Sequence, residues 1–235
     1  MTYLNPKQVI VEFLRANLTD PRGRVSSRSE SFAAIASQTT FSLTPTNGRK
    51  LSCITNVTVN GAAKTKWRDY RIDFQGQQVV FFTGLSLSDA VLISYREGST
   101  DWIYDDKPAV KIGPLSFPRI SITQVPLPGE RLGNFESPVE AAFILQHDVY
   151  AKEHNKDGDN IFTIDGKKYE GEALAEKLTW DILQAFDDSE DDLYPVLYNM
   201  IPLTSVPRDM PFDENYQAHR KQVEIQMKGL NMSEV

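Results

Sequence analysis

The sequence has few of the residues that most often carry catalysis, metal binding or covalent cross-links. Its 235 residues include one cysteine and three histidines. Cys53 has no partner for an intrachain disulfide, and its place in an alternating apolar stretch predicts a small buried hydrophobic residue. His147, His154 and His219 have no second histidine or cysteine at metal-ligand spacing, so we expect ordinary core or surface residues. The composition therefore excludes a disulfide scaffold and offers no zinc site.

Motifs for nucleotide binding or nucleophilic catalysis are missing as well. The sequence has no glycine-rich phosphate loop, Walker motif, serine elbow or CxxC pair. The stretch Asn155–Asn160 approaches a calcium loop, but with Gly158 at the sixth position Ile164 stands where the bidentate glutamate is needed. We expect a solvated turn there. Acidic residues are numerous, so a catalytic carboxylate pair stays open, but no pattern singles one out. We predict no catalytic, cofactor-binding or metal-ligating residue, no cofactor, and a protein that is not an enzyme.

The chain also lacks a basic excess and any long apolar run. It has 32 acidic against 25 basic residues, a net charge of −7, which disfavours binding along a nucleic-acid backbone. No apolar stretch approaches the about 20 residues of a membrane span, and the start MTYLNPKQVIVEF lacks the pattern of a signal peptide. We expect a protein that is made in the cytoplasm and has no membrane partner.

Two alternating stretches, Leu115–Gln124 and Ala142–Lys152, form the centre of the predicted fold. Successive side chains of a strand point to opposite faces, so period-two alternation predicts two middle strands of one sheet. The closing stretch His219–Gly229 also alternates and is predicted as a strand with one wet face, at an edge or interface of the sheet.

Helical spacing of apolar residues marks a second kind of element. An Asn5-Pro6 start with apolar residues at positions 9, 10, 13 and 14 predicts an amphipathic opening helix, and Glu172–Phe186 predicts a longer one. A further helix is expected over Leu193–Met200, with the acidic run Asp187–Asp192 in its first turn. The alternative for that run is a site for cations or a basic partner.

The segment from Ser29 to Arg96 differs from the rest because it predicts six short strands and no helix. Strong turn dipeptides such as Asn60-Gly61 separate them, which is typical of a small β-sandwich, and Ser26–Arg28 is expected to be a polar linker. We predict an α+β fold, an α/β-type curved mixed sheet flanked by helices, with an inserted all-β sandwich. The predicted boundaries are 1–27 with 97–235 for the discontinuous α/β domain and 28–96 for the insertion.

Five segments follow one another in the outer parts of the chain, within residues 2–24 and 102–235. They are VIVEFLRANLTDP, SFPRISI, FILQHDVYAK, YEGEALAEKLTWDILQAF and RDMPFDENYQAHRKQVEIQM. In their order along the chain and their pattern of apolar and polar residues, they resemble tail terminator (tail completion) proteins of tailed viruses of bacteria and archaea. Residues 29–96 depart from the compact members of that family and are similar to small β-sandwich modules of some phage tail fibres.

The resemblance implies a structural protein of the virion, located in the tail or neck. Such proteins form a ring, typically a hexamer, at the head-proximal end of the tail tube, stop tube growth and join the tail to the head. The implied partners are further copies of the chain, the tail tube protein and the head-tail connector protein, with DNA only passing through the lumen. The alternative is a tail-tip or adsorption protein whose sandwich exposes aromatic residues and binds a receptor or a neighbouring virion protein.

Five basic residues are candidates for the interface between subunits. Arg22 and Arg24 follow the opening helix, Arg119 lies on a central strand, and Arg220 and Lys221 lie at the start of the closing strand. The alternative for each is a solvated surface charge.

Overall fold

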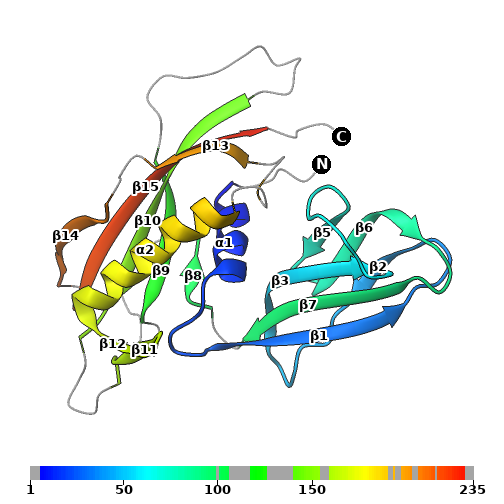
Figure 1. Cartoon of the computed structure of the whole chain (residues 1–235), viewed down its shortest axis with the longest axis horizontal. Helices are drawn as coiled ribbons and strands as arrows, with labels where there is room; N and C mark the ends of the chain where they lie inside the picture. The colour runs from blue at the N-terminus through cyan, green and yellow to red at the C-terminus, as the bar shows by residue number, and fades with distance from the viewer. Residues whose placement is uncertain are drawn as a thin grey trace. The chain divides into compact units, whose positions relative to one another are not determined.

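The structure, a computed structural model, describes residues 6–98, 101–105, 117–125, 140–153, 159–189, 193, 197–202, 206–214 and 216–230. It is a mixed α+β protein, as predicted, with two helices and about 52% strand. The chain divides into two compact units (Figure 1). Unit 1 consists of Met1–Arg22 and Trp102–Val235, and unit 2 consists of Gly23–Asp101.

The largest sheet of unit 1 has six strands in the order β13-β15-β10-β9-β8, with β14 also paired to β15. Neighbouring strands are antiparallel except β8 and β9, which are parallel. The two stretches predicted as middle strands are neighbours in this sheet, as β9 and β10. The bounds are β8 Ile103–Tyr104, β9 Arg119–Val125, β10 Glu140–Ala151, β13 Leu197–Pro202, β14 Arg208–Asp213 and β15 Ala218–Leu230.

Both helices, α1 (Pro6–Asn17) and α2 (Gly171–Ser189), lie on the same face of this sheet (Figure 1). Helix α2 packs on β10 and β15, and α1 packs on β8 and β9. The apolar positions predicted for α1 are buried, and the ring of Phe13 lies 5.1 Å from that of Phe186 on α2. Each such side chain contributes roughly 1.5–3 kcal/mol on burial, so packing against the sheet holds both helices in place.

A short hairpin of β11 (Phe162–Ile164) and β12 (Lys167–Tyr169) precedes α2. Its turn is Asp165-Gly166, and both residues have positive φ, 50° and 76°. A turn of that kind favours Asn or Asp followed by Gly, as the sequence has here.

Three predictions for the C-terminal part of the chain are wrong. The helix expected over Leu193–Met200 is wrong, because residues 197–200 belong to strand β13, which pairs with β15. Asp187 and Asp188 lie in the last turn of α2 and do not begin a helix. The predicted closing strand His219–Gly229 is present as β15, but its edge position is wrong, since β15 pairs with β10 on one side and with β13 and β14 on the other. An interface role for it stays a prediction.

Unit 2 contains two antiparallel sheets that share one buried hydrophobic cluster. The first has the order β1-β7-β3-β4 and the second β2-β6-β5. Phe41 and Phe81 from the second sheet and Ile93 and Tyr95 from the first belong to this cluster. The bounds are β1 Val25–Ala33, β2 Gln38–Ser42, β3 Lys50–Val59, β4 Ala62–Ala63, β5 Tyr70–Asp73, β6 Gln78–Leu85 and β7 Ala90–Gly98.

The local predictions for unit 2 have mixed outcomes. Cys53 is buried, as predicted, with 1% of its surface exposed. Asn60-Gly61 forms the β3–β4 turn with positive φ at both residues. The linker predicted over Ser26–Arg28 is wrong, because these residues belong to β1 and pair with β7. Their hydroxyl side chains suppress the apolar alternation by which a strand is recognised.

Candidate functional site

The two faces of the unit 1 sheet differ. The face toward the helices holds the hydrophobic core, and the helix-free face has polar side chains. On β10, Leu145, His147 and Val149 alternate with Gln146, Asp148 and Tyr150. Leu145, His147 and Val149 are buried, and His147 packs edge-on against Phe186 of α2, with ring centroids 5.7 Å apart. Asp148 is also fully buried, although it points to the helix-free face.

The buried carboxylate of Asp148 is satisfied by three side chains, and we call these four residues the Asp148 cluster. The Arg220 guanidinium donates to Oδ1 from Nε (3.1 Å) and Nη2 (2.8 Å). Gln222 Nε2 donates to the same oxygen at 2.9 Å, and Gln146 Nε2 donates to Oδ2 at 2.8 Å. All partners come from β10 itself or from β15, because Asp148 and Gln222 are directly opposite in the register of these strands. The cluster therefore fixes the register of the two longest strands.

The electrostatics of the Asp148 cluster are those of a structural ion pair. Burial tends to lower the pKa of Arg220, but the charge and hydrogen bonds of Asp148 more than offset this and raise it. Burial, with the negative charge of Asp148, raises the pKa of Tyr150 to about 12. With both carboxylate oxygens already accepting hydrogen bonds, this arrangement holds two strands together and leaves no free acid or base.

His147, one residue away, is the buried polar side chain without hydrogen bonds in this part of the sheet. Neither Nδ1 nor Nε2 makes a hydrogen bond among the described residues. Burial lowers the pKa of His147 to about 4, despite the carbonyls of Val223 and Leu145 and the charge of Asp148, which favour the protonated form. The ring is therefore neutral at pH 7 and acts as part of the core.

Arg119 and Lys221, two of the five predicted interface residues, have partners within unit 1. Arg119 is buried and lies over the ring of Tyr104, with Cζ 3.7 Å from the centroid, and its Nε donates to Ser121 Oγ at 3.2 Å. Lys221 bonds Glu172 in the first turn of α2 at 2.9 Å and also pairs with Asp209 of β14. These carboxylates raise the pKa of Lys221, although burial opposes them.

The two arginines after α1 fall in different units. Arg22 donates from Nε to the Phe117 carbonyl at 2.9 Å and from Nη2 to Asn160 Oδ1 at 2.9 Å, and it lies over the Phe162 ring. Arg24 is half-buried in unit 2. With Arg220 in the Asp148 cluster, four of the five predicted residues have identified intramolecular partners. A role for any of them between subunits stays a prediction.

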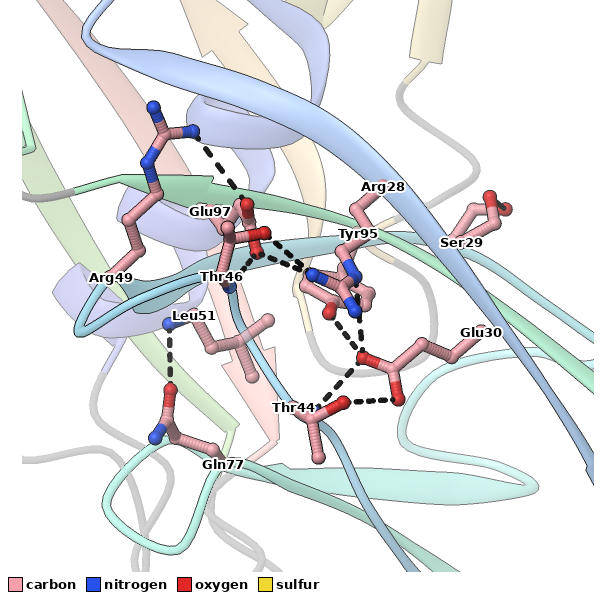
Figure 2. A network of polar contacts seen from close by, with 11 residues as sticks. Arg28, Ser29, Glu30, Thr44, Thr46, Arg49, Leu51, Gln77, Tyr95 and Glu97 are labelled. Carbon is pink, nitrogen blue, oxygen red and sulfur yellow. Dashed lines mark hydrogen bonds and ion pairs between the residues drawn. The ribbon is translucent and has the colours of Figure 1, made fainter.

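Unit 2 has its own polar network, shown in Figure 2. Glu30 of β1 accepts hydrogen bonds from the backbone N–H of Thr44 (2.9 Å), the Thr44 hydroxyl (3.0 Å) and the Tyr95 hydroxyl. Glu97 of β7 accepts from the Thr46 N–H at 2.8 Å and lies 3.6 Å from an Arg49 nitrogen. The network thus fixes residues 43–49, which connect β2 of one sheet to β3 of the other.

The same contacts set the protonation states of Glu30 and Tyr95. Burial tends to raise the pKa of Glu30, but the bonds from Tyr95 and Thr44 and the charge of Arg28 hold it below its usual value. Burial and the neighbouring Glu30 raise the pKa of Tyr95. A protonated tyrosine and an ionised glutamate at pH 7 form a stable hydrogen bond, and the geometry indicates a structural role.

The described part of unit 1 also contains a hollow of about 480 Å³ between the end of α1, the β11–β12 hairpin and α2. Its lining includes Asp20, Asp165, Asp181 and Asp188, and Lys177 is paired with Asp181. Over the described residues, no three histidine, cysteine or acidic side chains are grouped to hold a metal ion. The turn considered as a calcium loop, Asn155–Asn160, lies largely outside the described residues.

Comparisons with protein-family models, with curated proteins and with solved structures find no match to this chain. Among the described residues, neither helix is long and apolar enough to cross a membrane.

Sequence reasoning missed the acidic residues that organise both units. Asp148, Glu30 and Glu97 anchor the two networks, yet of their basic partners only Arg220 was predicted as a site residue. A signal was present, since Asp148 interrupts a predicted central strand and a buried charge needs a paired partner. Its partner could not be chosen without the register of β10 and β15.

Proposed function

We propose that this chain is a structural virion protein, a tail terminator subunit with an inserted β-sandwich. Its ring, of six subunits in this proposal, sits at the head-proximal end of the tail tube. There it stops growth of the tube and joins the tail to the head connector. Its partners are other copies of the chain, the tube protein and the connector protein, and DNA passes through the lumen without being held.

The observation that carries the proposal is how the five family-like segments come together in unit 1. They contain α1, β9, β10, α2 and β15, and these elements form one layered unit with two helices on one face of a sheet. The block with no counterpart in the compact family members, unit 2, has a separate core of its own. A scaffold that stays folded without this block is what an insertion requires.

The polar networks of both units suit a structural role. The Asp148 cluster and the Glu30–Glu97 network use their charges to hold strands and a connecting loop in place. In the proposal no bond is made or broken, and the protein is not an enzyme. The acidic net charge of −7 would repel DNA phosphates from a lumen and so favour their passage.

The direct biochemical test is tube growth in vitro. Purified tube protein of the same virus is allowed to polymerise with increasing amounts of this protein, and tube lengths are measured by electron microscopy. A terminator stops growth at amounts far below one subunit per tube subunit, because one ring blocks one end. The proposal is contradicted if the tube lengths stay unchanged when rings outnumber tubes and the protein is found nowhere on the tubes.

The tail-tip alternative finds less support in unit 2. It requires a stripe of exposed aromatic side chains. Of the five aromatic residues between positions 67 and 82, Tyr70 and Phe81 are buried while Phe82 is 53% exposed. Trp67 and Phe74 are half-buried. One exposed ring is a small surface for gripping a glycan, so the terminator proposal is preferred.

A further inference from the structure

Strand β1 is a long and regular edge strand of unit 2. It ends the sheet order β1-β7-β3-β4, and in the described part of the chain its strand partner is β7 alone. The nine residues pair with β7 in one continuous register with no bulge, and VSSRSESFA contains neither proline nor glycine. Edge strands are normally short, bulged, proline-containing or rich in lysine, because a regular free edge invites another strand.

The backbone groups that face the free edge can be assigned from the register. The N–H of Ala34 bonds the carbonyl of Asp89, which continues the β1–β7 register by one pair. In an antiparallel ladder, hydrogen-bonded and non-hydrogen-bonded pairs alternate. The N–H and C=O groups of Val25, Ser27, Ser29, Ser31 and Ala33 therefore point away from β7. Their side chains are small or hydroxyl-bearing and, apart from Val25, exposed, so a second strand could approach closely.

The charges of β1 make the strand complementary to itself. Within one chain Arg28 and Glu30 already lie 3.6 Å apart, and Glu30 also accepts bonds from Thr44 and Tyr95. An antiparallel copy centred on Ser29 places Arg28 of each chain opposite Glu30 of the other, so the two internal ion pairs join into one group of four charges. A slip to centre on residue 28 or residue 30 sets two arginines or two glutamates against each other. Opposite charges across a strand pair stabilise it and like charges destabilise it, so the charge pattern selects one register.

We propose that unit 2 binds a second copy of this chain by antiparallel β1–β1 pairing centred on Ser29. The two sheets then join into one continuous sheet across a two-fold axis. This contact is isologous, whereas a ring around a tube is built from heterologous contacts. The pairing is therefore proposed for the protein free in solution, and the inference goes beyond the proposed function and does not depend on it.

The test is the molar mass of the full chain by size-exclusion chromatography with light scattering, at tens of micromolar. Ser29→Lys puts two like charges on the two-fold axis, and Ser31→Pro removes an outward N–H while leaving the bonds to β7. The control is Thr55→Lys, which adds the same charge at an exposed position on β3, the strand that lies on the other side of β7 from β1. Circular dichroism verifies that each variant is folded.

The expected result is a wild-type mass of at least twice the 26.6 kDa subunit mass, halved in Ser29→Lys and Ser31→Pro and unchanged in Thr55→Lys. A wild-type monomer, or a mass that neither β1 variant changes, overturns the inference. A sixfold mass that resists both variants overturns it while leaving the ring proposal intact. Halving of the mass in both variants upholds it even where the protein fails to stop tube growth.

Discussion

The buried imidazole of His147 should make unit 1 lose stability in mild acid. Its folded pKa is about 4, against 6.5 for an exposed histidine, because the ring is fully buried. Between these values the unfolded chain binds a proton that the folded chain does not, so the free energy of unfolding falls as pH falls. At 1.36 kcal/mol for each pKa unit, the loss is about 3 kcal/mol by pH 4, with none above about pH 7.

The variant His147→Leu removes this titration and keeps an apolar side chain of similar volume in the core. Urea unfolding is followed by tryptophan fluorescence at several pH values between 7 and 4. Trp67 of unit 2 is replaced by phenylalanine in every protein compared, so that the signal comes from Trp102 and Trp180 of unit 1. Wild type should lose about 3 kcal/mol more than the variant over this range, and the subtraction cancels the carboxylates common to both. His147→Gln, polar but unable to titrate, should follow the leucine variant. Parallel pH profiles for all three proteins would refute the reasoning.

Three further changes test the packing by the free energy of unfolding in urea. Arg220→Met leaves the buried Asp148 carboxylate without its cation and should cost about 3–5 kcal/mol, whereas Arg220→Met combined with Asp148→Leu should recover much of that loss. Gly84→Ala brings a Cβ to 2.9 Å from the Ser37 backbone and should destabilise unit 2 by about 1–3 kcal/mol; a loss confined to unit 1 would be inconsistent with this contact. Leu14→Ala, in the buried face of α1, should cost about 2–5 kcal/mol, and a cost below 1 kcal/mol would show that α1 is not held by packing.

The elements that could be predicted from sequence are those with strong local periodicity. Helix α2 and strands β9, β10 and β15 follow from apolar residues repeating at helical or alternating spacing. The turn residues Asn60-Gly61 and Asp165-Gly166 were equally informative, because few other pairs adopt positive φ at both positions. Each of these signals lies within a short stretch of chain.

The features that failed depend on partners distant in the sequence. Strand β13 forms because β15 offers a pairing edge, and the same partnership makes β15 interior. The hydroxyl-rich start of β1 becomes a strand only because β7 lies beside it. The roles of Arg119, Arg220 and Lys221 likewise depended on partners on other strands, on the helix, or across a strand register. Local strand propensity is weak at these positions, so contacts with partners distant in the sequence decide which structure the residues adopt.

The measurement that tests the central claim most directly is the position of the protein on the virus particle. Intact particles are labelled with gold-conjugated antibody against the full chain and viewed by electron microscopy, with an antibody against the tube protein as the reference for accessible tail surface. A terminator ring predicts gold at the junction of head and tail. Gold at the distal tip would contradict the account and would make unit 2 the functional centre of the protein.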